Sequence, residues 1–440
     1  MRKAKQISRR GFLKKAGGSL AAATVVPAVA LGKAERPAPS ERIAIGCVGV
    51  GPQGTAVMNG FMTQKDAQVV AVCDVKSDVL KQSQVLVNKH YQSEGCATYK
   101  DFRDLVGQKD IDVVSVATCD HWHVLVSLAA VRSGKDIYME KPMGLSLDEF
   151  QILRKEVNRY DRRFQFGTQQ RSSRNFRFAC ELVQNGRIGE LHTINVWSPA
   201  SQSGGPTESA PVPEWLDYNM WLGPAPYKPY TLDRCSNKWW WFISDYALGF
   251  IAGWGIHPID IALWGGRIDK AGNIEVEGKG EFPTAGVCDT AVHWDVKMKF
   301  AHGLKLNFTD SQMPEEWPKR YGRVCGHGTA FEGSEGWVHV DRFGINTQPE
   351  NLVKTSWGPN DIHLYESNNH QRNLLDCVKS RKQTICPVDE AVKGEILCHI
   401  SDITIRLKKK LLWDQKKEKF INNDEANQRL TRSMRSPWHL

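Results

Sequence analysis

A glycine-rich turn directly after an apolar segment sets the first limit on how this 440-residue chain can fold. Gly49, Gly51 and Gly54 have the spacing G-x-G-x-x-G, and Pro52 and Gln53 lie between them. Glycines at this spacing permit a tight turn and let a pyrophosphate approach a helix N-terminus, where free N–H groups and the helix dipole favour an anion. The turn therefore predicts a dinucleotide-binding site.

An acidic residue twenty positions after the last glycine supports this interpretation. Asp74 lies in the next apolar segment, 68–75. A carboxylate at the end of this strand can bind both ribose hydroxyls, and it repels a 2′-phosphate. The alternative is a glycine-rich turn beside a solvent-facing Asp. With strand, helix and acid in order, the sequence favours NAD over NADP as the cofactor.

Apolar runs and helical patterns alternate through the first part of the chain. We expect strands at 42–50, 68–75, 111–118 and 136–140, and helices at 55–62, 77–90 (opened by a Ser cap) and 124–133. Repeated units of this length are typical of a doubly wound parallel sheet with helices on both faces. The fold class is therefore α/β, with an NAD-binding Rossmann domain expected at 41–165.

The pattern changes after residues 164–168. Longer strands are expected at 191–198 and 297–309, a loop rich in Ser, Gly and Pro at 201–213, and helix at 387–410. These segments predict a C-terminal α+β domain at 166–440, with a large, mainly antiparallel sheet that binds the substrate. Its last helices are expected to pack back on the first domain.

The N-terminus predicts export. Residues 8–14 (SRRGFLK) have the form of a twin-arginine signal, and a weakly apolar segment, 16–31, follows with an A-x-A cleavage site at 28–30. We expect a signal peptide at 1–30, a linker at 31–40, and a protein exported already folded to the periplasm or beyond. A disordered basic tail is the alternative.

The net charge of +9 is concentrated in that N-terminal segment. Seven basic residues and no acid fall in the first thirty positions, and the rest of the chain has 51 basic and 49 acidic residues. Nucleic acid is therefore not an expected partner. No later stretch reaches the roughly 20 apolar residues of a membrane helix, so no membrane insertion is expected.

Two polar clusters follow predicted strands, at the sheet edge where ligands bind. Thr118, Asp120 and His123 belong to the sequence TCDHWH, and Glu140 precedes Lys141 in EKP. A Lys here can move a proton if burial or a nearby cation lowers its pKa, although an ordinary surface Lys is the alternative. The two His residues lie only two positions apart with no third ligand cluster, so we expect cofactor-facing side chains and no metal.

Seven motifs together resemble the glucose–fructose oxidoreductase / inositol dehydrogenase (Gfo/Idh/MocA) family. They are GVGPQG at 49–54, CD at 73–74, TCDHWH at 118–123, GKDIYMEKP at 134–142, GTQQRS at 167–172, NGRIGEL at 185–191 and GWGIHPIDIALWG at 253–265. The resemblance covers residues 41–440 and is strongest to an exported bacterial branch. It implies a sugar or glycoside oxidoreductase.

The resemblance also implies residue roles. Lys141 lies next to the nicotinamide and the reacting carbinol, and His257 is the second catalytic group. Relatives often carry an Asp four residues before this His, where the chain has Gly253. Asp260, three residues after His257 on the same helix, is expected to orient the ring instead. Without the family, a core histidine is the alternative for His257.

A run of three tryptophans, 239–241, favours a carbohydrate ligand. The C–H faces of sugar rings pack on aromatic rings, and alternate side chains of a strand face opposite ways, so part of the run would be exposed. We place Trp241 in the substrate site. Gln170 and Arg171 match a substrate-facing position of the family.

Two other functions stay open. One is an NAD-dependent glycosidase that oxidises C3 transiently, acidifies the C2 hydrogen and eliminates the aglycone; related glycosidases tend to lack the EKP lysine. The other is a non-catalytic sugar-binding protein, supported only by Gly253.

Free NAD is scarce outside the cytoplasm, so export predicts a tightly bound cofactor regenerated in place. The family also implies a homo-oligomer.

Overall fold

The computed structural model describes residues 37–440, except 269–271 and 323. The predicted signal peptide and most of the predicted linker lie outside these residues. A short 3-10 helix spans Pro39–Glu41. Residues 43–440 form one compact unit, which is described from here on.

The first sheet of this unit is parallel throughout. Its six strands have the order β3-β2-β1-β4-β5-β6. They are β1 Ile43–Val48, β2 Ala67–Cys73, β3 Ala97–Tyr99, β4 Val113–Val116, β5 Asp136–Met139 and β6 Phe164–Phe166. Every residue of β4 and β5 is buried, as expected for strands covered on both faces. This arrangement confirms the predicted doubly wound sheet.

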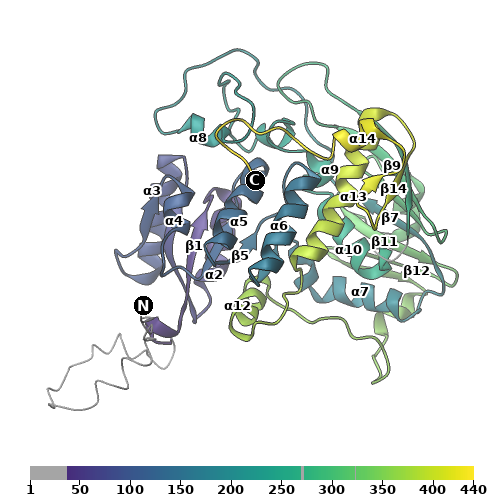
Figure 1. The fold of residues 1–440 in the computed structure, drawn as a ribbon. Helices are drawn as coiled ribbons and strands as arrows, with labels where there is room; N and C mark the ends of the chain where they lie inside the picture. Colours follow the sequence, from purple (N-terminus) through teal and green to yellow (C-terminus); the bar gives the residue numbers. More distant parts are fainter. Residues whose placement is uncertain (1–36, 269–271, 323) are drawn as a thin grey trace, which may run out of the picture. The chain divides into compact units, whose positions relative to one another are not determined.

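Five α-helices alternate with these strands along the chain (Figure 1). They are α2 Pro52–Met62, α3 Ser77–Tyr91, α4 Phe102–Val106, α5 Asp120–Arg132 and α6 Leu147–Arg159. Helices α4 and α6 were not predicted, and three helix starts differ from the prediction. Helix α2 begins at Pro52 and not at 55. Helix α3 has Lys76 as its N-cap, so Ser77 is its first helical residue and not a cap. Helix α5 begins at Asp120, four residues before the expected start. The prediction missed residues 120–123 because they are all buried and show no amphipathic period.

The second sheet has nine strands in the order β13-β12-β11-β7-β10-β9-β8-β14-β15. Only the β7–β10 pair is parallel. The strands are β7 Leu191–Trp197, β8 Ile274–Glu281, β9 His293–Phe300, β10 Lys305–Thr309, β11 Gly328–Gly333, β12 Trp337–Asp341, β13 Gly344–Gln348, β14 Leu411–Asp414 and β15 Lys419–Phe420. The mainly antiparallel sheet was predicted.

The strand expected at 297–309 is instead a hairpin of β9 and β10. Gly303, with φ +96°, provides the left-handed conformation that the connecting turn requires. Phe300 and Leu304 close the turn, since the amide of Phe300 donates to the Leu304 carbonyl at 2.9 Å.

Helices α7, α10 and α13 pack on the second sheet (Figure 1). Helix α13 also contacts α6, so it joins the two sheet regions within the unit. The helical segments of this part are η2 Gln169–Ser172, α7 Arg174–Gln184, α8 Tyr218–Leu222, η3 Trp240–Phe242, α9 Phe250–Gly253, α10 Ile256–Gly266, α11 Glu316–Tyr321, η5 Glu350–Lys354, α12 His370–Ser380, α13 Val388–Leu407 and α14 Asp424–Gln428. The tryptophan run, 239–241, thus lies at the 3-10 helix η3 and not in a strand.

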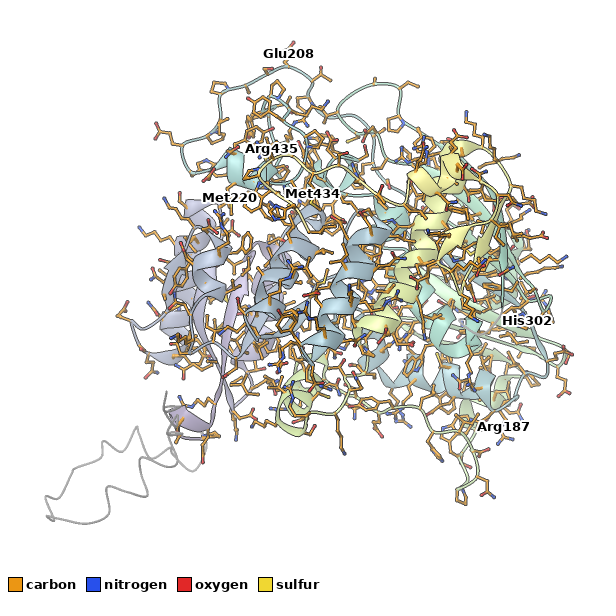
Figure 2. All side chains as sticks on the ribbon, viewed as in Figure 1. Arg187, Glu208, Met220, His302, Met434 and Arg435 are labelled. Carbon is orange, nitrogen blue, oxygen red and sulfur yellow. The ribbon has the colours of Figure 1, made fainter. Side chains whose placement is uncertain are left out.

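The segment 429–440 returns to the first sheet region. Arg435 of this segment is labelled in the upper part of Figure 2. Its guanidinium donates to the Asn219 side chain at 2.8 Å and to the Gly223 carbonyl at 2.9 Å. Trp438 packs edge-on against Trp122 of α5, with the ring centroids 4.6 Å apart. The tail therefore supports α5 from the side that faces α8.

Candidate functional site

The turn between β1 and α2 has the geometry that a pyrophosphate requires. Gly49 has φ +78°, and a Cβ there would lie 2.6 Å from the main chain of Ala117 and Thr118. A Cβ at Gly54 would lie 1.9 Å from the Gly49 carbonyl oxygen. Gly51 has open space within 4 Å, and no side chain caps α2 at this residue. The helix N-terminus is therefore accessible to a phosphate group.

Asp74 is held at the end of β2 by the main chain. One carboxylate oxygen accepts from the amide of Val50 and the other from the amide of Lys76, both at 2.9 Å. Burial raises the pKa of Asp74, and the two amides and the Lys76 charge oppose that rise. The carboxylate therefore has a fixed orientation before any ribose binds.

One cavity brings the predicted cofactor residues together. Its lining includes Gly49, Gly51, Pro52, Gln53, Gly54, Asp74, Thr118, Asp120, His123, Glu140, Lys141 and Trp241. Reasoning from sequence missed Lys76, Lys100, Trp221 and Asn237, which also line it. Apart from the tryptophan run, nothing in the local pattern of 219–241 indicates that this segment covers the cavity. These residues fit a dinucleotide, with a turn for its phosphates and a carboxylate for a ribose.

His123 and Asp120 have different surroundings at this edge. Both ring nitrogens of His123 lie against carbonyls, Nδ1 at 2.6 Å from Pro142 and Nε2 at 3.0 Å from Thr118. This residue therefore ties together the chain segments after β4 and β5. Asp120 is 1% exposed, and neither of its carboxylate oxygens has a hydrogen-bond partner. Burial raises its pKa strongly, against the attraction of Lys141.

Lys141 follows β5 and reaches across to the second region. Its Nζ donates to the Gly253 carbonyl at 2.9 Å and lies 4.9 Å from the ring centroid of Trp241. Burial lowers the pKa of Lys141, while Glu140 and Asp120 partly oppose this effect. A lowered pKa increases the share of neutral amine, the form that accepts a proton.

His257 lies on α10, 1% exposed, and its Nδ1 has no hydrogen-bond partner. Burial and the nearby Lys141 charge hold its pKa well below the ordinary value, so the ring is neutral at neutral pH. The ring of Trp254 lies edge-on at 5.6 Å between centroids.

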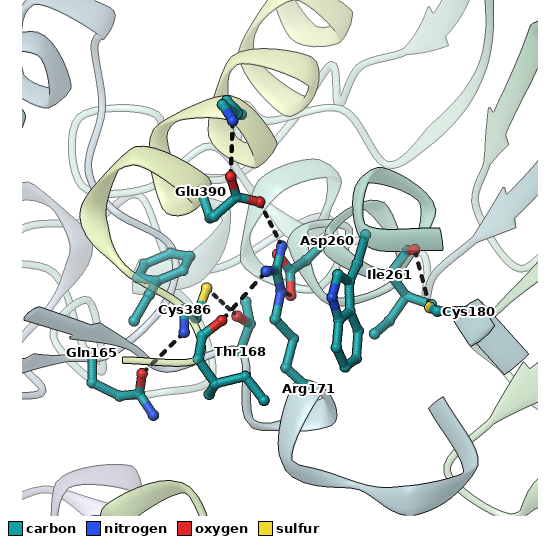
Figure 3. A network of polar contacts seen from close by, with 12 residues as sticks. Gln165, Thr168, Arg171, Cys180, Asp260, Ile261, Cys386 and Glu390 are labelled. Atoms are coloured by element: carbon teal, nitrogen blue, oxygen red, sulfur yellow. Dashed lines mark hydrogen bonds and ion pairs between the residues drawn. The ribbon is translucent and has the colours of Figure 1, made fainter. Parts of the chain in front are cut away.

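Figure 3 shows the Asp260 carboxylate on the Arg171 guanidinium. The Nδ1 of His257 has no hydrogen-bond partner, so Asp260 does not hold this ring nitrogen. The Arg171 guanidinium donates to the Asp260 carboxylate from Nε at 2.9 Å and from a terminal nitrogen at 2.7 Å, and also reaches Glu390 at 3.3 Å. Arg171 is only 3% exposed, and a buried guanidinium requires a carboxylate partner. The expected orienting role of Asp260 is therefore replaced by an ion pair that fixes α10 against η2.

Gln170 acts on the same helix from its other side. With its amide oriented to satisfy both neighbours, it donates to the His257 carbonyl at 3.1 Å and accepts from the Arg342 Nε at 3.2 Å. Neither Gln170 nor Arg171 lines the cavity. Their contacts are with His257, Arg342, Asp260 and Glu390, which do not line it either.

The space beside Gly253 explains the departure from the family pattern. A Cβ at this position would lie 3.1 and 3.2 Å from two ring atoms of Trp241. The indole, stacked on Trp240 with centroids 4.2 Å apart, thus occupies the volume that a larger side chain would need. Lys141 faces an aromatic ring and a carbonyl here, where relatives often offer an Asp.

Across residues 37–440, with the gaps given above, no three His, Cys, Asp or Glu side chains are grouped to hold a metal ion. Within the same residues, no helix combines the length and apolarity needed to cross a bilayer. All eleven cysteines are described, and all are free thiols.

Two family models match the chain. One, "Oxidoreductase family, NAD-binding Rossmann fold", matches residues 43–168, and the other, "Oxidoreductase family, C-terminal alpha/beta domain", matches 197–440. Fold and site thus define an oxidoreductase with an NAD-binding Rossmann domain. The second match alone spans more than half of the sequence, and the chain belongs to the Gfo/Idh/MocA family.

Curated relatives match over shorter stretches. Myo-inositol 2-dehydrogenase of Thermotoga maritima is 28% identical over 174 residues, which are 40% of this chain and 47% of the relative. A glycosyl hydrolase family 109 protein of Shewanella amazonensis is 28% identical over 204 residues, 42% of this chain and 44% of the relative. The chain thus spans about half the length of the curated relatives it matches.

Solved structures match nearly the whole chain. The WlbA dehydrogenase of Bordetella pertussis, in complex with NADH and UDP-GlcNAcA, has a TM-score of 0.62 and 14% identity, with 84% of this chain and 98% of that chain covered. GenD2 from gentamicin A biosynthesis, in complex with NAD, has a TM-score of 0.61 and 17% identity, with 87% and 98% covered. At these identities the likeness shows the fold.

Proposed function

We propose that this protein is an NAD-dependent oxidoreductase that acts on a carbinol of a sugar or glycoside. The observation that carries the proposal is the place of Lys141. It lines the cavity together with the glycine turn and Asp74, and its Nζ and the His257 ring both lie within 6 Å of the Trp254 ring centroid. NAD, when bound, supplies the hydride acceptor or donor.

The residues of the chain bind the cofactor, move the proton and hold the sugar. Asp74 binds the ribose diol, and the turn at Gly49–Gly54 binds the pyrophosphate. Lys141, with its lowered pKa, takes the hydroxyl proton during oxidation and returns it during reduction. The neutral His257 hydrogen-bonds the same hydroxyl, and Trp241 offers an apolar face to the sugar ring.

We further propose that the cofactor is NAD, held tightly and exported with the folded protein by the twin-arginine route. Support comes from the sequence of residues 8–14 and from Asp74, whose fixed charge disfavours a 2′-phosphate. A protein outside the cytoplasm needs a cofactor that it does not release. Regeneration in place then requires a second substrate or a redox-neutral reaction.

A glycosidase is the second candidate, because glycosyl hydrolase family 109 proteins are among the matched relatives. Transient oxidation at C3 would use the same Lys141, followed by elimination of the aglycone. Release of a free aglycone without net cofactor reduction would favour this candidate. Formation of a ketosugar would favour the oxidoreductase.

The decisive experiment begins with the purified, extensively dialysed protein. Mass spectrometry under non-denaturing conditions should show one retained dinucleotide of the mass of NAD or NADH. A panel of sugars and glycosides should then change the nicotinamide absorbance without added cofactor. A protein without a dinucleotide that is active only with a stoichiometric supply of NAD would overturn tight binding and leave the oxidoreductase in place.

A further inference from the structure

Four polar groups surround the ring of Trp254, the residue between α9 and α10. Measured to its centroid, the Arg342 Cζ lies at 4.7 Å and the Lys141 Nζ at 5.9 Å. The ring centroids of His327 and His257 lie at 5.2 and 5.6 Å. Lys141 and His257 belong to the site proposed above. Arg342 and His327 have no role there, although they share the same indole.

Arg342 is a cation without a counterion. It lies in the turn between β12 and β13, where its side chain is exposed to solvent. Its Nε donates to Gln170, and in the described part of the chain no carboxylate lies within 4 Å of its guanidinium. Arg171, by contrast, is bound by Asp260 and Glu390. The two terminal nitrogens of Arg342 therefore remain available to a ligand.

His327 adds a buried polar atom without a partner. The residue is 8% exposed, and its Nε2 has no hydrogen bond. Burial, followed by the charge of Arg342, lowers its pKa to about 4, so the ring is neutral at neutral pH. A buried nitrogen left unpaired is unfavourable unless a ligand satisfies it.

Arg342 has no carboxylate in contact with its guanidinium. Glu140 and Asp120 act on Lys141, and Glu140 also attracts Arg342 without forming an ion pair with it. A guanidinium stacked on an indole presents its terminal N–H groups in one plane, a geometry that matches two oxygens of a carboxylate, sulfate or phosphate. An oxyanion at this place would give Arg342 a direct partner.

We propose that Arg342 and His327 form a subsite for an oxyanion carried by the sugar, so that the substrate is an acidic sugar or an acidic glycoside. This inference rests on the proposed function, because the sugar must place its reacting carbinol between Lys141 and His257. Arg342, His327 and Lys141 all lie within 6 Å of the Trp254 ring centroid, so one sugar unit can reach Lys141 with its carbinol and the subsite with its acidic substituent.

The test is calorimetric binding to the dialysed protein as purified, with matched pairs of sugars. Each pair consists of a methyl glycoside and the corresponding methyl glycosiduronate, in the gluco, galacto and manno series. Sugar 6-sulfates and 6-phosphates form the other arms and identify the oxyanion. We expect at least one acidic member to bind roughly 10- to 100-fold more tightly than its neutral partner, the range of a charge-assisted hydrogen bond.

Arg342→Gln should abolish this difference, and Arg342→Lys should restore part of it. The matched control is Arg187→Gln, which removes a surface cation that pairs with Asp361 instead. Equal affinities within every pair, absence of binding in all pairs, or an undiminished preference in Arg342→Gln would each overturn the subsite. Oxidation of a neutral sugar with equal affinities would leave the proposed function standing, so the two failures are distinguishable.

Discussion

The two walls of the site differ in whether their polar groups have partners within the protein. The cofactor wall, formed by Gly49–Gly54 and Asp74, satisfies its polar atoms with main-chain groups of the protein itself. The substrate wall, formed by Lys141, Trp241, Trp254, His257, His327 and Arg342, leaves ring nitrogens of both histidines buried without partners. On the first wall the protein itself fixes the Asp74 carboxylate, and the uncapped start of α2 stays open to a phosphate. The second wall has buried ring nitrogens that are left for a ligand.

The largest effect is expected from substitutions that remove the proton-transfer groups and leave the cofactor wall intact. Lys141→Met and His257→Ala should each lower the rate of nicotinamide reduction in a single turnover by roughly 10²–10⁴, the usual range for lost acid–base assistance. Retention of the dinucleotide, measured by native mass spectrometry, should be unchanged in His257→Ala. A near-native rate in either variant would contradict the division into two walls.

A smaller effect is expected on the cofactor wall. Asp74→Ala removes the charge that repels a 2′-phosphate and the acceptor for the ribose diol, so the preference for NAD over NADP should narrow by roughly 10- to 100-fold. Competition binding on protein stripped of its cofactor measures this ratio. Asp78→Ala, which removes an exposed acid at the start of α3, is the control and should leave the ratio unchanged.

Gly253→Ala tests the contact between a glycine and an indole in the substrate wall. The new Cβ would press on Trp241, whose ring faces Lys141, so turnover should fall by about tenfold or less through misplacement of the amine. The double variant Gly253→Ala/Trp241→Leu relieves this contact. A double-mutant cycle should therefore show coupling, and strictly additive effects would mean that the ring does not depend on Gly253.

The smallest effect concerns the pH profile. Trp241→Phe weakens the attraction of the ring for the Lys141 ammonium by roughly 0.5 kcal/mol, so the pKa of Lys141 should fall further. Oxidation requires the neutral amine, and the rate rises with pH through this pKa. A lower pKa therefore moves the acid limb of kcat/KM to lower pH. Trp239→Phe, whose ring faces Lys238, should leave the limb in place.

The cofactor wall could be predicted from sequence because its residues are close in the chain and each has a backbone reason to be there. Gly49 needs a left-handed φ, and Asp74 lies at a strand end. The partners of the substrate wall come from distant segments. Asp260 shows the difficulty. Helix spacing predicted a contact with His257, but the carboxylate pairs with Arg171, which lies 89 residues away in the chain. Arg342 lies in a turn with no motif around it.

Trp438 is synthesised near the end of translation, so its contact with Trp122 forms late. The glycine turn and Asp74 emerge early, and Trp438 emerges after every other segment that lines or supports the cavity. Helix α5 therefore gains its last support only when almost the whole described chain has left the ribosome. On the proposed function, we expect nucleotide loading to follow translation, and a chain that ends before Trp438 to retain less nucleotide.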